Sequence, residues 1–253
     1  VENFISYMAR VNCCAFSPDC QLVLTCSDDW PPLPVEIVQW ETRGQSTWSH
    51  RSGSSEGWPV KRCTFSKDGC LFASASHDCT TRVWSTSPIQ CIHILTGHLR
   101  SVETVTFSLD GRSLVSGGWD NIALLWDIHT GLRLRQFCGH SAAVQSSAFS
   151  TDSQWLATGS WDHTAKLWSL SGDEEVVTLT GHRGNVVCLC FSTTGMLVSF
   201  NFPKKSKKDL CFLLATILVN INTFSLFHCT NYWNIWYLKA VRVLLLQWLL
   251  FWF

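Results

Sequence analysis

The stretch "GHSAAVQSSAFSTDSQWLATGSWDHTAKLW" (Gly139–Trp168) decides the fold. Small or apolar residues alternate with polar ones over 143–150, and the runs 155–160 and 165–168 have the composition of short strands. "TDSQ" and "WDHT" lie between these runs and are typical of tight turns. A fourth run, 176–179, follows after a polar loop. The stretch therefore predicts four short antiparallel strands within about 40 residues.

This pattern recurs along the chain at a fixed step. The "FS" pairs that begin at Phe107, Phe149 and Phe191 follow the pair at Phe65 in steps of 42 residues, and an earlier pair begins at Phe16. The same 42-residue spacing separates the successive "GH" pairs. It also separates one tryptophan and one aspartate of each period from their counterparts in the next. A four-stranded unit repeated every ~40 residues predicts the blades of an all-β propeller, because a single blade cannot bury both of its faces.

The residues "GH…FS…GSWDHTAKLW" resemble the WD-repeat family of β-propellers over residues 8–199. The resemblance implies an incomplete propeller of about four four-stranded blades and a partial fifth, because the family commonly has seven blades. We expect the domain to consist of blades at 8–50, 57–96, 98–138 and 140–180 and the partial blade at 182–199.

The resemblance also implies that His, Ser or Thr, Asp and Trp in each repeat form a hydrogen-bonded tetrad that locks a loop to its sheet. The same residue types could form a nucleophilic triad, but an active site occurs once, whereas this set recurs blade after blade. We therefore expect a structural role, and no catalytic, cofactor-binding or metal-binding residues. The expected tetrads are His98, Ser116, Asp120 and Trp126; His140, Thr158, Asp162 and Trp168; and the partial set Ser74, Asp78 and Trp84.

The number of tetrad residues present in each repeat predicts how rigid its blade is. The second repeat has Glu56 where His is expected, and the first has Tyr7 there and about five extra residues around "WPPLPVEIV". Proline cannot donate to a strand ladder, so the turn of the first blade is enlarged. We expect blades three and four to be the rigid centre and blade one to be the weakest.

The residue before the turn aspartate points toward one rim of the propeller in the family that this chain resembles. Exposed tryptophan is favoured as an interface anchor, and arginine pairs well with acidic groups. The indoles could instead lie over the neighbouring blade and cap it. These two interpretations stay open. The candidate rim residues are Trp119, Trp161, His77, Arg100 and Arg183.

Charge and cysteine content bound the function. Nineteen basic and nineteen acidic residues cancel, so the charge gives no argument for a nucleic-acid partner. The thirteen cysteines show no disulfide or zinc-like spacing. We expect them to be small buried hydrophobes in a reducing compartment, the cytoplasm or the nucleus. Several lie in apolar strand patterns: Cys13, Cys14, Cys63, Cys188 and Cys190.

The repeat stops inside a strand at Phe200, and residues 200–253 contain no glycine and only one acidic residue. Three interpretations compete for this tail. The apolar runs in 210–227 and 240–253 could anchor the chain in a membrane, and "KKSKK" could be a weak nuclear signal. The third interpretation is that the tail did not evolve as part of a propeller and is, for example, a translated intron. The break within a strand favours this interpretation. We expect a truncated form that begins, at Val1, without its natural N-terminus.

These observations predict a non-enzymatic scaffold that binds a protein or peptide through the propeller rim, without a cofactor. The alternative is a membrane-tethered propeller, in which the tail holds the repeats at a membrane surface as a platform.

Overall fold

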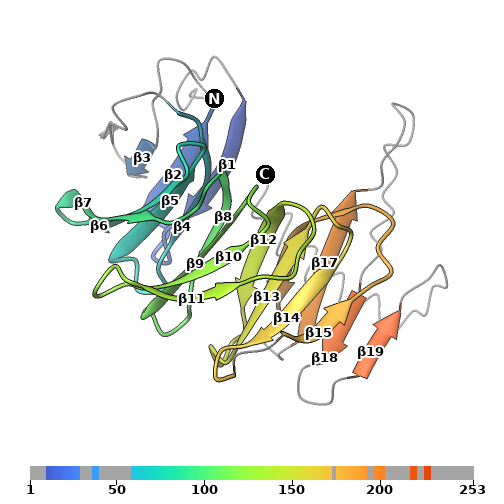
Figure 1. Cartoon of the computed structure of the whole chain (residues 1–253). Helices are drawn as coiled ribbons and strands as arrows, with labels where there is room; N and C mark the ends of the chain where they lie inside the picture. The colour runs from blue at the N-terminus through green and yellow to red at the C-terminus, as the bar shows by residue number, and fades with distance from the viewer. Residues whose placement is uncertain are drawn as a thin grey trace, which may run out of the picture.

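The computed structural model shows an all-β protein in which antiparallel sheets follow one another along the chain (Figure 1). Its described residues form strands, turns and loops, and none of them lies in a helix. The fold class therefore agrees with the prediction from the sequence. The structure describes residues 10–28, 36–39, 58–172, 175–192, 196–202, 217–220 and 225–228.

Each sheet is built from strands that are neighbours in the sequence, paired antiparallel. The first sheet has β1 (Val11–Phe16), β2 (Leu22–Ser27) and β3 (Glu36–Gln39). The second has β4 (Val60–Phe65), β5 (Leu71–Ser76), β6 (Thr80–Thr86) and β7 (Ile89–Thr96). The third has β8 (Val102–Phe107), β9 (Ser113–Gly118), β10 (Ala123–Asp127) and β11 (Arg133–Phe137). The fourth has β12 (Val144–Phe149), β13 (Trp155–Ser160), β14 (Ala165–Ser169) and β15 (Glu175–Leu179). The fifth has β16 (Asn185–Phe191), β17 (Met196–Phe202), β18 (Ile217–Asn220) and β19 (Ser225–His228).

The sheets pack face to face as propeller blades. The first strand of each blade lies against the first two strands of the preceding blade: β4 on β1 and β2, β8 on β4 and β5, β12 on β8 and β9, and β16 on β12 and β13. Figure 1 shows the blades fanning out in chain order from β1 to β19. Among the described strands, none of the fifth blade packs extensively on the first. The propeller is therefore incomplete.

The turn between the second and third strands of a blade is tight and repeats with the same step as the sequence. Cys79, Asn121 and His163 occupy its left-handed position, with φ of 68°, 66° and 70°. The preceding aspartate holds this conformation through its side chain: Asp162 Oδ1 accepts a hydrogen bond from the Thr164 N–H at 2.9 Å. An Asp side chain that binds the backbone two residues on is a common way to fix such a turn. The repeated aspartate is thus first of all a turn residue.

The recurring "FS" pair marks the turn between the first and second strands. Ser108 Oγ donates to Asp110 Oδ1 at 2.5 Å and accepts the backbone N–H of Ser113 at 2.9 Å. The serine is buried and its phenylalanine neighbour Phe107 packs in the core, so the pair joins the turn to the sheet. The same serine-to-aspartate hydrogen bond occurs between Ser17 and Asp19, Ser66 and Asp68, and Ser150 and Asp152, so the serine of the pair holds this turn in blades one to four.

The core lies between blades rather than within one. A single apolar cluster combines Ala73 and Val83 of the second blade with Val105 and Leu114 of the third. At two of the contacts the blades approach so closely that only glycine fits beside the next blade. A Cβ added at Gly159 would lie 2.6 Å from Val186 Cγ1, and one at Gly117 would lie 2.7 Å from Val144 Cγ1.

The fifth blade extends further than the sequence repeat. We expected its second strand to end at Ser199, but β17 continues to Phe202, where it pairs with Asn185 at the start of β16. Two tail segments, β18 and β19, complete a four-stranded sheet. Strand pairing uses backbone groups, so it does not require the repeat motif; alternating residues such as "MLVSFNF" are sufficient.

Several expectations fall outside the described residues. They include Tyr7, the proline-rich insertion of the first blade at 31–34, Glu56, and the tail region 240–253. Of the segment 210–227, which could alternatively anchor the chain in a membrane, the structure describes 217–220 and 225–227, both within strands. No helix in the described part of the chain has the length and apolar character that a membrane crossing requires.

The glycine contacts give a test of packing between blades. We expect Gly159→Ala to destabilise the protein by about 1–3 kcal/mol, because the new methyl group overpacks the contact with the fifth blade. Gly172→Ala is the matched control, since its added Cβ meets nothing closer than 3.7 Å. Urea unfolding measures both, and equal stability of the two variants would contradict the close approach.

Candidate functional site

The third blade contains a continuous hydrogen-bonded chain of four side chains from four places in the sequence. His98, in the loop before β8, has Nδ1 2.8 Å from Asp120 Oδ2 and Nε2 2.8 Å from Ser116 Oγ. Trp126 Nε1–H donates to the same Ser116 oxygen at 2.8 Å. Because the aspartate carboxylate can only accept, the Nδ1–H of the imidazole donates to Asp120. In this tautomer Nε2 accepts the serine O–H, and the serine oxygen accepts the indole N–H.

The fourth blade repeats this arrangement with threonine in place of serine. His140 Nδ1 lies 2.8 Å from Asp162 Oδ2, and its Nε2 lies 2.8 Å from Thr158 Oγ1. Trp168 Nε1–H donates to Thr158 Oγ1 at 2.8 Å. The Ser141 N–H also donates to Asp162, so the carboxylate binds both the turn and the loop before β12.

The other blades have part of the chain. In the second, Trp84 Nε1–H donates to Ser74 Oγ at 3.1 Å, and Asp78 instead forms an ion pair with Arg82 at 3.4 Å. In the fifth, His182 Nε2 lies 2.6 Å from Ser199 Oγ. The structure therefore brings together the complete tetrads expected in blades three and four. In blade two it joins Ser74 to Trp84 but leaves Asp78 outside this hydrogen-bonded chain.

The geometry of the tetrads does not suit nucleophilic catalysis. Ser116 and Thr158 are both 0 % exposed, so no substrate reaches their hydroxyl groups. Each hydroxyl is also occupied by two partners, the imidazole and the indole. Buried networks in which every member is satisfied stabilise a unique arrangement, and this is what the geometry supports.

The histidine partners influence the ionisation of the turn carboxylates. Burial alone would raise the pKa of Asp162, but the hydrogen bonds from His140 and Thr164 outweigh it and hold the pKa well below its usual value. The pKa of Asp120 is lowered in the same way. Burial alone would raise it, but the interaction with His98 and the hydrogen bond from the Leu99 N–H together outweigh the effect of burial. Both carboxylates are therefore anions in the folded protein near neutral pH.

The rim contains a pair of tryptophans in contact across two blades. Trp119 and Trp161 have ring centroids 4.7 Å apart at 67°, an edge-to-face geometry. Trp119 Nε1–H donates to Glu103 Oε1 at 2.7 Å, which fixes the first indole. Both side chains nevertheless remain more than a third exposed, at 38 % and 37 %. The indoles thus pack against each other and still present a face to solvent.

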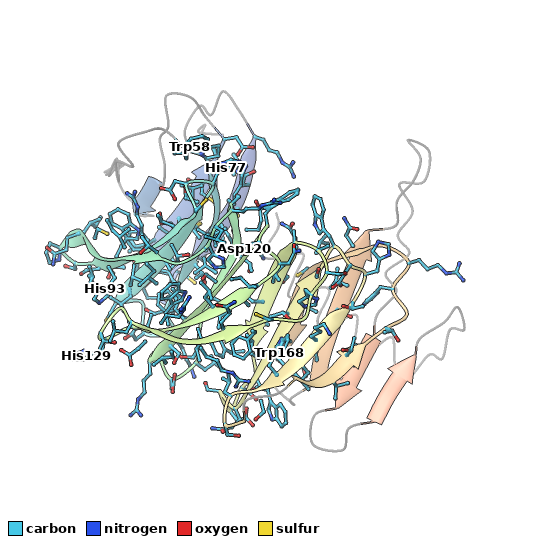
Figure 2. All side chains as sticks on the ribbon, in the orientation of Figure 1. Trp58, His77, His93, Asp120, His129 and Trp168 are labelled. Carbon is cyan, nitrogen blue, oxygen red and sulfur yellow. The ribbon has the colours of Figure 1, made fainter. Side chains whose placement is uncertain are left out.

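The remaining rim candidates are also exposed to solvent. His77 is exposed and stacks on Trp58, with ring centroids 5.2 Å apart and planes 8° apart (Figure 2). Arg100 and Arg183 are exposed in the loops before β8 and β16. The sequence analysis missed Glu103 and Trp58. Trp58 precedes Arg100 by one 42-residue step, so the period could have identified it.

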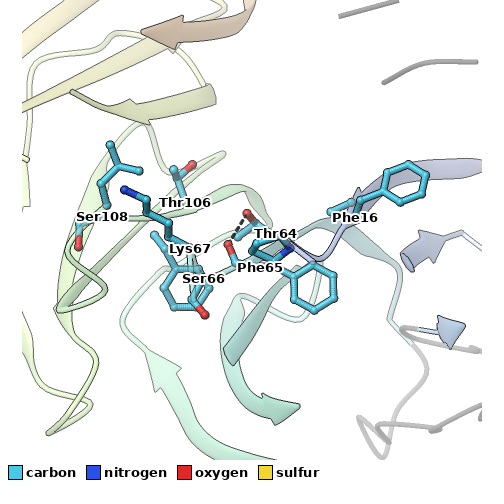
Figure 3. Close-up of a pocket in the computed structure, with 11 residues that line it drawn as sticks. Phe16, Thr64, Phe65, Ser66, Lys67, Thr106 and Ser108 are labelled. Carbon is cyan, nitrogen blue, oxygen red and sulfur yellow. Dashed lines mark hydrogen bonds between the residues drawn. The ribbon is translucent and has the colours of Figure 1, made fainter. Parts of the chain in front are cut away.

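A pocket of about 270 Å³ opens at the opposite ends of the first strands (Figure 3). It is lined by residues that follow or end β1, β4 and β8, among them Phe16, Ser66, Lys67 and Ser108. Lys67 is the one ionisable side chain in this lining, so the pocket offers no acid–base pair.

The cysteines differ in part from the expectation. None of the eleven in the described residues forms a disulfide, but only Cys26 and Cys63 are buried. Cys14 is exposed, although its strand pattern is apolar, because it lies in the first blade and no described blade precedes it to cover β1. Cys13, Cys188 and Cys190 are half-buried.

A comparison with protein families matches the model of the WD domain, or G-beta repeat, to residues 4–30, 46–85, 89–127, 131–169 and 173–199. These segments cover more than half of the chain. The chain belongs to the WD40-repeat family. No curated protein matches it. The last WD40 segment ends at residue 199, where the sequence repeat was expected to stop.

The WD40 repeats are offset from the structural blades by one strand. The segment 89–127 begins with β7, the outermost strand of the second blade, and ends with β10 of the third; 131–169 likewise runs from β11 to β14. The WD40 repeats 89–127, 131–169 and 173–199 therefore cross from one blade to the next, and in this part of the chain the sequence repeat itself links neighbouring blades.

The tetrads predict unequal costs for the same substitution. Ser116→Ala leaves both the His98 imidazole and the Trp126 indole without their buried partner, so we expect a loss of about 2–4 kcal/mol of stability. Ser74→Ala removes the partner of Trp84 alone, and we expect about 1–2 kcal/mol. Urea unfolding at neutral pH gives both values. A Ser74→Ala loss equal to or larger than the Ser116→Ala loss would show that the tetrad does not act as a unit.

The carboxylates predict a loss of stability in acid. Because the pKa of Asp162 is lowered in the folded protein, its contribution is present above the unfolded value near pH 4 and is lost as the pH falls below it. We expect the free energy of unfolding of Asp162→Asn to fall less steeply than that of the parent between about pH 4 and pH 2. Parallel curves would contradict the coupling to His140.

Proposed function

We propose that this WD40 protein is a non-enzymatic scaffold that binds a protein or peptide partner at the rim formed by Trp119, Trp161, His77, Arg100 and Arg183. The observation that carries the proposal is the Trp119–Trp161 pair. Two indoles in edge-to-face contact, each more than a third exposed, form a preorganised apolar surface on a blade contact. Fixed aromatic side chains of this kind dominate binding energy at interfaces, because little side-chain entropy is lost on binding.

The charges of the rim candidates suggest the partner's chemistry. The exposed guanidinium groups of Arg100 and Arg183 are suited to carboxylates, whereas Glu103 is already bonded to Trp119. The partner is therefore a segment that combines an apolar side chain for the indole face with acidic residues for the arginines. Neither a phosphate backbone nor a cofactor is part of the proposal.

The family supports this class of function. WD40 repeats generally mediate protein–protein contacts without catalysis, and the buried hydroxyl groups of the tetrads fit that class. We infer a location in the cytoplasm or nucleus, where thiols stay reduced. In the order of its repeats, with "SVETVTFS", "SGGWD" and "ATGSWD", the chain is similar to WD repeat-containing protein thirty-eight, and we propose that it is a truncated form of such a protein. No observation in the described residues favours the membrane-tethered alternative.

The proposal is tested by selecting ligands from a random peptide library on the full chain. We expect enriched peptides to combine an apolar residue with acidic ones, and Trp161→Ala to weaken their binding at least tenfold by isothermal titration calorimetry, since an aromatic hot spot is worth about 2 kcal/mol or more.

Leu134→Ala is the matched control, because Leu134 is exposed and apolar but lies on the outer strand β11. It should leave binding unchanged. The Trp161→Ala variant could instead unfold more easily than the parent and still bind the selected peptides as tightly. That result would show that the indoles only cap the blades.

A further inference from the structure

Three cysteine sulfur atoms meet at the contact between the first and second blades. Cys13 on β1, Cys26 on β2 and Cys63 on β4 have Sγ atoms that all lie within 4.8 Å of one another. Cys26 and Cys63 are 0 % and 3 % exposed, and Cys13 is half-buried. Cys13 and Cys26 are direct cross-strand partners, and Cys13 Sγ also lies 3.6 Å from the backbone oxygen of Cys63. The cluster therefore joins two blades.

The other blade contacts show that the fold does not require cysteine here. The equivalent positions hold Thr104, Gly117 and Ser147 between blades three and four, where the two hydroxyl oxygens lie 3.1 Å apart. Between blades two and three, the equivalent positions hold Arg62, Ala75 and Val105. Between blades four and five, they hold Ser146, Gly159 and Leu189. The sequence repeat thus places three equivalent positions at each contact. Only the first described contact supplies three thiols.

We propose that Cys13, Cys26 and Cys63 bind one Cu(I) ion as three thiolate ligands, which makes the first blade contact a metal site. Thiolates are soft ligands that select soft ions such as Cu(I). On binding, each cysteine releases its proton to solvent and forms one sulfur–metal bond, and the ion keeps its oxidation state.

The number of ligands favours Cu(I) over zinc. Structural zinc sites almost always have four protein ligands. In the described residues the cluster contains three cysteines and no further His, Cys, Asp or Glu side chain. Cu(I) forms stable three-coordinate complexes with thiolates, so three sulfur atoms complete its coordination.

The distances require only a small adjustment. Sulfur atoms bound at about 2.3 Å around one ion in a plane are about 4 Å apart. The observed separations of up to 4.8 Å therefore have to shorten by less than about 1 Å, which side-chain rotation provides without moving paired strands.

The repeat supplies substitutions that keep the fold. Cys26→Ala, Cys63→Val and Cys13→Ser each introduce a residue that another blade contact has at the same position: Ala75, Val105 and Ser146. Cys70→Ala and Cys138→Ala are matched controls, because these exposed cysteines lie in other parts of the described chain. Circular dichroism and urea unfolding check that every variant is folded.

The experiment titrates the reduced full chain with Cu(I) under anaerobic conditions, in competition with a Cu(I) chelator such as bathocuproine disulfonate. We expect the parent and both control variants to retain one more Cu(I) equivalent than each cluster variant. X-ray absorption of the one-equivalent complex should show three sulfur ligands. We also expect the melting temperature of the parent, but not of the cluster variants, to rise on binding.

Three results would overturn the proposal: equal copper retention by the parent and the cluster variants, loss of copper in only one of the three, or a spectrum with fewer than three sulfur ligands. Zn(II) held by the same cysteines in preference to Cu(I) would overturn the choice of ion. The spectrum of the parent decides the question even if a variant fails to fold.

Discussion

The contact between successive blades is the constraint on which the rest of the structure depends. A four-stranded sheet cannot bury both faces alone, so the first strand of each blade packs on the first two strands of the blade before it. The approach is close enough at Gly117 and Gly159 that a single methyl group would collide with the next blade. Because the WD40 repeat begins on one blade and ends on the next, the chain connection reinforces the same contact.

The tetrads and the rim both follow from this packing. Each tetrad fixes the loop before a first strand to the turn after a second strand, so it holds the two segments that form the rim in one geometry. In blades three and four these segments include Trp119 and Trp161, which then contact each other across the blade boundary. The surface proposed to bind a partner is therefore rigid because the buried polar groups beneath it are satisfied.

The sequence predicts those features that repeat, because repetition multiplies a weak local signal. The step of 42 residues was sufficient to place the strands of blades two to four and the tetrad residues such as His98 and Asp120. It was not sufficient for contacts between blades, which join residues far apart in the chain. The Trp119–Trp161 pair and the cluster of Cys13, Cys26 and Cys63 are of this kind. The β18 and β19 strands were missed because backbone pairing needs no motif.

Hydrogen exchange measured by mass spectrometry on the full chain tests the central claim most directly, that packing between blades holds the rim rigid. The account predicts the strongest protection in β8, β9, β12 and β13, which have a blade on either side, and weaker protection in β1. Peptides that contain the turns at Trp119 and Trp161 should exchange their amide hydrogens as slowly as peptides from these strands. Exchange in β8 and β12 as fast as in β1 would contradict the account.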